Sequence, residues 1–210
     1  MSTPDPAYRR PIDLKHGRVD LAFGAGGQAM AQLIAELFAR AFANDYLARG
    51  DDAAVLPALT AGERLVLATD AHVVSPLFFP GGDIGSLSVH GTINDLAVMG
   101  ARPLYLAASF ILEEGFALAE LARIVDSMAT AARAAGVAVV TGDTKVVERG
   151  KGDGVFITTT GVGTLPPGRE IGGARARPGD AVLLSGTIGD HGVAVLAQRA
   201  GLEFEAPLLS

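Results

Sequence analysis

The sequence of 210 residues contains no cysteine, so disulfide bonds, zinc–thiolate sites and a cysteine nucleophile are excluded within it. It also has no run near the roughly 18 uncharged apolar residues of a membrane span, although its mean hydropathy is +0.34. Residues 1–15 carry Pro, Asp and Arg where a signal peptide would have an apolar centre. We therefore expect a globular, cytoplasmic protein that does not associate with a membrane.

Basic side chains are also scarce. The formal net charge is −6 and the pI is about 5.2, whereas nucleic-acid affinity rests on clustered Lys and Arg. We therefore expect a small-molecule partner and no nucleic acid. Only Lys15, Lys145 and Lys151 are lysines among the 17 basic residues, so a lysine inside a motif is informative.

The hydrophobic pattern predicts alternating helices and strands. The expected helices cover residues 28–42, 85–99 and 117–135. The expected strands begin at Arg64, Pro103, Gly136 and Gly154. The order α-β-α-β-α-β-β predicts an α+β fold in which helices cover one face of a mixed β-sheet. The second helix is rich in Gly, Ser and Thr, so we expect another segment to approach its backbone closely.

The segment from Thr164 is dense in Pro, Gly and Arg and is typical of a linker. Beyond it, "DAVLLSG" resembles a strand and "VAVLAQRAG" a helix, which together cannot bury a core. We therefore expect a first domain in residues 1–165. Residues 166–210 would be a linker and the incomplete start of a second α/β domain, so the chain would be a C-terminally truncated protein.

The stretch "FGAGGQAMAQLI", residues 23–34, allows three interpretations. Gly24, Gly26 and Ala29 match a dinucleotide-binding turn, but no strand leads to the acidic residue expected about 20 positions later. A second interpretation is a tight entry turn that uses glycine for its geometry. The third is a loop that folds over the phosphates of another nucleotide, because its backbone N–H groups and the following helix start suit an anion.

Acidic residues at loops and apparent strand ends carry the stronger signal. Asp70 follows "LVLAT" and Asp143 follows "VAVVTG", while Asp52 and Asp95 lie in "RGDDAAVL" and "TINDLAVMGA". Carboxylates gathered in one place repel unless cations lie between them, and Mg²⁺ bound with phosphates takes one or two carboxylates per ion. We therefore expect these four to converge on more than one metal ion and a polyphosphate substrate.

Two neighbouring features refine this expectation. Asp83 has the position of a helix N-cap, and it lies about 18 Å along a continuous helix from Asp95, too far to share an ion. In "TGDTKVV", Asp143, Thr144 and Lys145 offer a carboxylate, a hydroxyl and a point charge to a phosphate. The four histidines show no metal-ligand spacing.

Several long stretches resemble an ATP-binding superfamily that includes aminoimidazole ribonucleotide synthetase, selenophosphate synthetase and thiamine-monophosphate kinase. They resemble most closely the HypE family of hydrogenase maturation factors. The stretches are "GAGGQAMAQLI", "TDAHVVSPLFFPGGDIGSLSVHGTINDLAVMGA", "FILEEG", "ARAAGVAVVTGDTKVV" and "SGTIGDHG". The resemblance implies a domain that dimerises by joining its sheet to that of a partner, with ATP and Mg²⁺ bound in a cleft near the seam.

The resemblance also implies a reaction: ATP-dependent dehydration of a carboxamide, carried on a C-terminal cysteine, to a thiocyanate that supplies cyanide to nickel-iron hydrogenase. Implied metal ligands are Asp52, Asp70, Asp95 and Asp143. Implied catalytic residues are Lys145, toward the phosphates or the reacting group, and Asp95, in proton handling. Implied ATP-binding residues are Asn94, Thr141, Gly142, Thr144, Lys145 and Asp83.

Implied partners are a second copy of the chain, the carbamoyltransferase HypF and the scaffold proteins HypC and HypD. The chain departs from the family in lacking the cysteine tail and in having Phe23 where a His usually precedes the glycines. We therefore expect the nucleotide-binding, dimer-forming portion of such an enzyme. The alternatives are a small-molecule kinase or synthetase of the superfamily, and a non-catalytic dimerisation and docking module.

Overall fold

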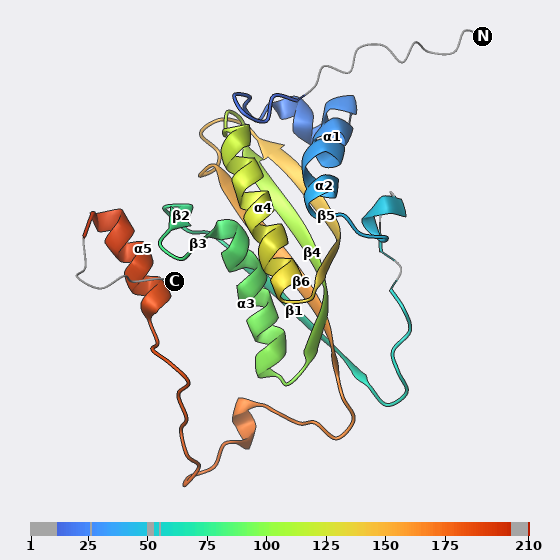
Figure 1. Cartoon of the computed structure of the whole chain (residues 1–210), viewed down its shortest axis with the longest axis vertical. Helices are drawn as coiled ribbons and strands as arrows, with labels where there is room; N and C mark the ends of the chain where they lie inside the picture. Colours follow the sequence, from blue (N-terminus) through green and yellow to red (C-terminus); the bar gives the residue numbers. More distant parts are fainter. Residues whose placement is uncertain (1–11, 26, 50–52, 55, 203–209) are drawn as a thin grey trace.

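The computed structural model describes residues 12–25, 27–49, 53–54, 56–202 and 210. Its centre is a four-stranded sheet in the order β1-β6-β4-β5 (Figure 1). The strands are β1 (Arg64–His72), β4 (Arg102–Glu113), β5 (Ala138–Val147) and β6 (Val155–Leu165). β4 and β5 are parallel, whereas β6 is antiparallel to both β1 and β4. The predicted mixed sheet is therefore confirmed.

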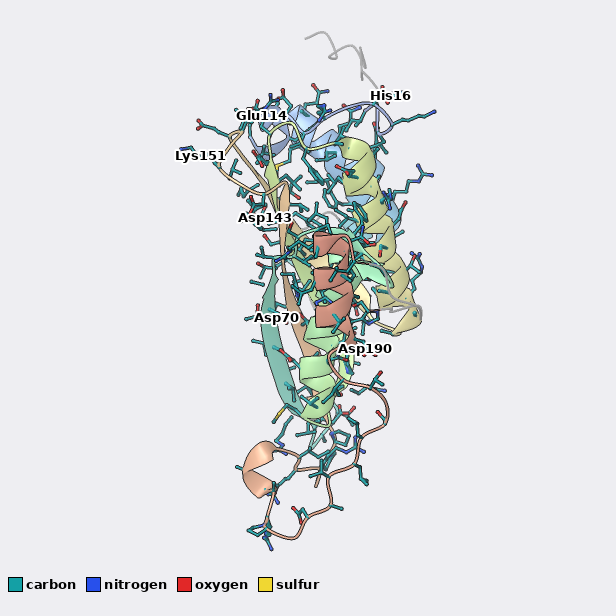
Figure 2. The ribbon with its side chains drawn as sticks, turned by 90° about the vertical axis from the view of Figure 1, so that its left-hand side faces the viewer. His16, Asp70, Glu114, Asp143, Lys151 and Asp190 are labelled. Carbon is teal, nitrogen blue, oxygen red and sulfur yellow. The ribbon has the colours of Figure 1, made fainter. Side chains whose placement is uncertain are left out.

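Helices cover one face of this sheet, also as predicted (Figures 1 and 2). α3 (Ile84–Val98) packs on β1 and β6, and α4 (Leu118–Ala134) packs beside α3. The core lies between these helices and the inward side of the sheet, with Leu106, Phe110, Ile124 and Met128 all fully buried. The opposite face exposes apolar side chains, such as Leu67 with 64% of its surface accessible.

The small residues of α3 serve the close approach that the sequence indicates. A Cβ on Gly85 would collide with the backbone carbonyl oxygen of Ile124, so glycine lets α3 and α4 cross in backbone contact. Ser88 and Thr92 are fully buried on the same helix. A short hairpin, β2 (Phe78–Phe79) and β3 (Gly82–Asp83), precedes α3 and is not predicted by the sequence pattern.

The N-terminal helix is one continuous segment made of three parts. α1 (Gln28–Leu33) passes into a π-helical turn, η2 (Ile34–Phe38), and then into α2 (Ala39–Ala41). The predicted helix 28–42 is confirmed, while its π turn is not predicted. Phe38 packs on Phe110 of β4 with ring centroids 4.9 Å apart, which fixes this segment over the β4–β5 side of the sheet.

The chain after β6 differs from the prediction in one respect. Residues 180–186 all lie in the described part and form no strand, because Val182 and Leu183, 97% and 90% exposed, have neither a pairing strand nor a core. The predicted helix is confirmed as α5 (Asp190–Ala200). It contacts the β2–β3 hairpin, where His191 lies edge-on to Phe79 at 5.4 Å.

None of the helices in the described ranges is long and apolar enough to cross a membrane.

Candidate functional site

A cavity of about 510 Å³ lies between the N-terminal helical segment and the β4–β5 side of the sheet. Its apolar wall includes Phe38, Phe42 and Phe110. The polar part of its lining is the β5 segment Thr141, Gly142, Asp143 and Thr144. This volume and this mixture of an apolar wall with few polar groups are typical of small-ligand sites. All four residues of this segment are among those the sequence singles out.

Two irregularities shape this cavity. The pairing of β4 with β5 shifts between Leu106/Ala107 and Val139/Thr141, so Val140 is a bulge beside the polar wall. The π turn η2 places Ile34 and Phe38 on the facing wall. Single-turn π insertions and bulges both occur frequently next to functional sites, because they redirect side chains.

Close packing of β5 against β4 requires glycine at position 142. A Cβ there would collide with the carbonyl oxygen of Ala108 on the neighbouring strand. Val139, another lining residue, accepts a hydrogen bond of 2.8 Å at its carbonyl oxygen from the Asn44 Nδ2.

Asp143 and Lys145 lie together on the edge strand β5, at the rim of the cavity, with their side chains toward the open face of the sheet. The Lys145 Nζ is 3.8 Å from the Asp143 Oδ2, and both side chains are more than half exposed. Solvent screens such an exposed pair, so its contribution to stability is small. The other carboxylate oxygen of Asp143 accepts a 2.8 Å hydrogen bond from the Thr144 backbone N–H. Both charged groups are thus available to a ligand.

The glycine stretch lies beside this rim. The turn η1 (Leu21–Gly24) packs on β5, and a Cβ on Gly24 would come within 2.7 Å of the Val146 backbone nitrogen. The structure therefore gives Gly24 the packing role of a tight entry turn, next to Lys145. Gly26 lies outside the described residues, and Gly27 begins α1 as its N-cap residue.

A second cluster, the Asp70–Asp95 cluster, lies between β1 and α3 and consists of Asp70, His72 and Asp95. The His72 Nε2 is 3.9 Å from the Asp70 Oδ2. A Cβ on Gly91 of α3 would lie 3.1 Å from that carboxylate oxygen and 2.8 Å from the His72 ring. Asp95 follows Gly91 by one helical turn, so it lies on the same side of α3.

His72 is 93% buried, since only 7% of its surface is accessible. Burial lowers the pKa of His72 below its ordinary value, while the carboxylates of Asp70 and Asp95 oppose that shift. The Nε2 of His72 lies 3.2 Å from the Thr159 hydroxyl of β6, which also contacts Thr92 of α3 at 2.6 Å.

A single chain does not bring the predicted carboxylates together. Asp70, Thr159, Ala108 and Gly142 form one row across the sheet from edge to edge. Three strand spacings separate Asp70 from Gly142, which is about 14 Å. Asp143 is the residue after Gly142 on β5. Asp70 also lies on the helix-covered face and Asp143 on the open face. The expectation that all four converge within one chain is therefore wrong.

The premise behind that expectation is also wrong, since neither aspartate ends its strand. β1 continues to His72 and β5 continues to Val147. Asp83 is the N-cap of α3, and its Oδ1 accepts hydrogen bonds from the Gly85 and Ser86 backbone N–H groups. Asn94 and Asp95 are exposed on the last turns of α3. Asp52 lies outside the described residues.

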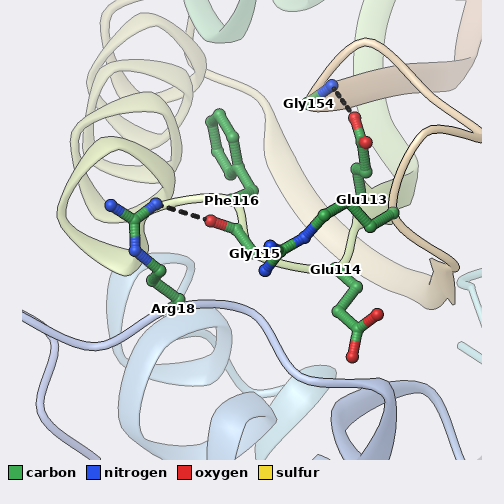
Figure 3. Close-up of a pocket in the computed structure, with 7 residues that line it drawn as sticks. Arg18, Glu113, Glu114, Gly115, Phe116 and Gly154 are labelled. Atoms are coloured by element: carbon green, nitrogen blue, oxygen red, sulfur yellow. Dashed lines mark hydrogen bonds between the residues drawn. The ribbon is translucent and has the colours of Figure 1, made fainter.

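Another cavity, of about 370 Å³, contains none of the predicted site residues (Figure 3). It lies at the β4–α4 turn, where Arg18 donates to the Gly115 carbonyl oxygen at 2.8 Å. The Glu113 carboxylate accepts hydrogen bonds from the Gly150 and Gly154 backbone N–H groups, which lower the pKa of Glu113. These bonds join three segments of backbone, so we assign this region a structural role.

Comparison with known proteins decides the family. Residues 50–165 match the model of the AIR synthase related protein, N-terminal domain. The chain belongs to this AIR synthase-related family. It is 70% identical over 97% of its length to the carbamoyl dehydratase HypE of Cupriavidus necator, and 68% identical over 94% to that of Azotobacter vinelandii. The chain spans 58% and 57% of those proteins.

Several solved structures share the fold. The hydrogenase maturation protein HypE in complex with ATP matches with a TM-score of 0.87 and 53% identity, over 90% of this chain and 56% of that one. A HypE–HypF complex matches with a TM-score of 0.68 and 53% identity, over 85% of this chain and 57% of that one. The thiamine-monophosphate kinase of Stenotrophomonas maltophilia matches with a TM-score of 0.62 and 30% identity, over 89% of this chain and 56% of that one.

The described residues bring together at most two carboxylates that could bind a magnesium ion. Among the described residues, no three His, Asp or Glu side chains gather as a metal site. Asp70 and Asp95 both act electrostatically on His72, and the Asp70 carboxylate lies next to Gly91. Two carboxylates are sufficient for Mg²⁺ that retains waters and phosphate oxygens. The donor types of Asp70 and Asp95 therefore suit the ion, and Asp143 does not share it with them within one chain.

His72 and the phenylalanines of the cavity wall are the site residues that sequence reasoning missed. In "TDAH" the histidine follows Asp70 by two positions, which on a strand puts both on one face. That spacing is the signal that could have found it. The phenylalanines carry no such signal, because they read as ordinary core positions.

Proposed function

We propose that this chain is the ATP-binding and dimer-forming part of an ATP-dependent carbamoyl dehydratase of hydrogenase maturation, working in the cytoplasm. The observation that carries the proposal is the cavity lined by residues 141–144, in a fold that matches a HypE structure with ATP at a TM-score of 0.87. The name of the 70% identical Cupriavidus necator protein supports the reaction class.

In this proposal the cavity on β4 and β5 receives the nucleotide. Its apolar wall excludes water, while Thr141, Gly142 and Thr144 provide polar contacts. Lys145 offers a positive charge to the phosphates from the rim, and the turn at Gly24 lies beside it. Asn94 and Asp83 belong to the proposed ATP-binding set, with Asp83 acting through the start of α3, which it caps.

Asp70 and Asp95 would hold Mg²⁺, together with Asp52 and with Asp143 of a second copy of the chain. The ion, when bound, neutralises phosphate charge and polarises a phosphoryl oxygen. Asp95, exposed at its end of α3, would also take up or release a proton at the reacting group.

A homodimer would complete this site. Asp70 and Asp143 lie on opposite edges and opposite faces of the sheet, so one chain does not offer both to one metal–phosphate group. In a symmetric pair, the edge of one copy can meet the opposite edge of the other. Leu65, Leu67 and Ile111 are exposed apolar residues of the sheet, and a second copy that covered them would bury apolar surface.

The cysteine that carries the carboxamide would belong to a longer protein, because this chain contains none. We propose a division into a domain of residues 1–165 and the start of a second domain in residues 166–210. HypF would supply the carbamoyl group, in keeping with the matching HypE–HypF complex. HypC and HypD would receive the product as scaffold proteins.

A small-molecule kinase is the second candidate. It is favoured only by the 30% identical thiamine-monophosphate kinase structure. ATP turnover stimulated by thiamine monophosphate would support it over the dehydratase. A non-catalytic docking module is the third candidate, and a stable dimer by light scattering without nucleotide binding would support it.

Calorimetry with Mg-ATP tests the proposal. We expect the wild-type chain to bind and Asp143→Asn to bind about 10-fold to 100-fold more weakly, because the substitution removes a carboxylate from the proposed metal–phosphate site and a charged contact contributes about 1.5–3 kcal/mol. Asp126→Asn, an exposed acid on α4, is the matched control and should bind as the wild type does. Equal affinity of wild type and Asp143→Asn would remove Asp143 from the site.

A further inference from the structure

The loop that follows α2 supplies part of the cavity wall. It runs from Phe42, which closes α2, to the short 3₁₀ turn η3 (Leu47–Arg49). Residues 43–49 are all described and pair with no strand, yet Phe42 and Leu47 both line the cavity. Figure 1 shows the loop leaving α2 beside β5. The groups that hold this loop therefore also set the position of the wall.

Asn44 makes four hydrogen bonds that hold the loop. Its Oδ1 accepts from the Tyr46 and Leu47 backbone N–H groups at 2.9 and 3.1 Å. Its Nδ2 donates to the carbonyl oxygens of Phe42 and Val139, both at 2.8 Å. An amide oxygen accepts and an amide nitrogen donates two hydrogens, so only this orientation of the side chain satisfies all four partners.

Three of these four partners line the cavity, namely Phe42, Leu47 and Val139. The bond to Val139 is the one that crosses to the sheet, because the other three partners lie within three residues of Asn44. Val139 belongs to the edge strand β5 and directly precedes the bulge at Val140. One side chain thus fixes the loop wall and the sheet wall relative to each other.

A second anchor ties the same loop to β4. The Tyr46 hydroxyl lies 3.0 Å from that of Tyr105, and the two rings meet edge to face with centroids 5.4 Å apart. The Arg49 guanidinium lies 5.7 Å from the centre of the Tyr46 ring. The loop is therefore held to β5 by Asn44 and to β4 by Tyr46, which fixes Leu47 between these anchors and η3.

The cavity separates apolar from polar surface. The N-terminal helical segment and the loop contribute only apolar side chains to it, among them Phe38, Phe42 and Leu47. The polar lining comes from β5, between Thr141 and Thr144. An aromatic and aliphatic wall suits a flat heteroaromatic ring, whereas hydroxyls and charged groups suit phosphates. A nucleotide in this cavity would therefore rest its base on the wall that Asn44 holds.

We propose that Asn44 is a positioning residue: by tying the loop at Phe42 and Leu47 to β5, it holds the apolar wall at the distance from the sheet that accepts the base of a nucleotide. This rests on the proposed function, because it assumes that the cavity receives ATP. Asn44 acts on the nucleotide only through this wall. Its loss should weaken contacts with the base and leave contacts with the phosphates unchanged.

Two probes separate these contacts: Mg-ATP, and Mg-tripolyphosphate, which has the phosphates but no base. In calorimetry the wild type should bind both, and Mg-ATP more tightly. Asn44→Ala should lower affinity for Mg-ATP about tenfold, the size of one hydrogen bond's net contribution, and leave affinity for Mg-tripolyphosphate unchanged.

Asn44→Asp isolates the tie to the sheet. Its carboxylate keeps the two acceptor contacts with the loop N–H groups, but its second oxygen meets the Phe42 and Val139 carbonyl oxygens, which can only accept. We expect the same selective loss as for Asn44→Ala. Wild-type affinity of Asn44→Asp for Mg-ATP would show that the tie to Val139 does not position the wall, and would overturn the proposal.

Asp45→Asn is the matched control, because Asp45 is exposed next to Asn44 in the same loop, and it should match the wild type for both probes. Thermal melts confirm that each variant is folded. Equal losses for both probes in Asn44→Ala would show a merely structural role, and unchanged affinity for Mg-ATP would remove Asn44 from the site; either result overturns the proposal.

The wild type alone gives a further test. The proposal requires separable contributions from base and phosphates, so a wild type that binds only Mg-ATP, or binds both probes equally tightly, overturns it as well. A wild type that binds neither probe would contradict the proposed function itself.

Discussion

At the scale of the residue, the alternation of side chains along the two edge strands decides where the carboxylates point. Asp70 pairs with Thr159, whose hydroxyl reaches into α3, so Asp70 lies on the helix-covered face. Thr144 is buried opposite Phe110, so its neighbour Asp143 lies on the open face. The sequence places both residues after apolar runs but does not fix the strand order, and the strand order separates them.

The Glu113 carboxylate predicts a pH dependence of stability. Its hydrogen bonds from Gly150 and Gly154 lower the pKa of Glu113 in the folded chain, so the unfolded chain binds the proton more readily. The stabilisation is complete well above the ordinary value of 4.5 and is lost as the pH falls below it. Between about pH 5 and pH 3, the free energy of unfolding should therefore fall more steeply for wild type than for Glu113→Gln.

Urea denaturation across that pH range measures the difference. Glu148→Gln, an exposed glutamate near the same turn, should keep the wild-type slope. Identical slopes for wild type and Glu113→Gln would contradict the assignment of these hydrogen bonds.

At the scale of the element, the helices and sheet strands follow from periodicity because each buries one apolar face. The observed α3, Ile84–Val98, and α4, Leu118–Ala134, differ from the predicted ranges by about one residue at each end. The π turn at Ile34–Phe38 leaves no signal in the pattern, since its residues also fit an α-helix. The run "DAVLLSG" has the composition of a strand, but a strand needs a partner, and residues 180–186 pair with none.

The crossing of α3 and α4 gives a prediction for this scale. Gly85→Ala should destabilise the fold by about 1–3 kcal/mol, because the new methyl group meets the backbone of Ile124 rather than a side chain that could move. Gly192→Ala is the control: it lies in α5 with open space around it, so it should be neutral or stabilising by up to about 1 kcal/mol. Chemical denaturation compares the two, and equal stabilities would show that the helices do not cross in backbone contact.

At the scale of the whole molecule, one sheet has a covered face, an open apolar face and half of the proposed site at each edge. The α+β architecture follows from the order of elements along the sequence. The arrangement of the site does not, because it depends on which strands are at the edges and on what the open face contacts. In the proposed homodimer, a second copy of the chain covers the open face and brings the two halves of the site together.

The central claim is that Asp70 of one copy and Asp143 of the other serve the same nucleotide, and mixing variants tests it most directly. Asp70→Asn and Asp143→Asn should each bind Mg-ATP weakly as separate samples. When the two are unfolded together and refolded at equal amounts, half of the dimers combine both variants, and each such dimer has one intact site. About a quarter of all sites should then bind with wild-type affinity in calorimetry, as two-fold symmetry requires. No recovery of tight binding in the mixture would contradict the account.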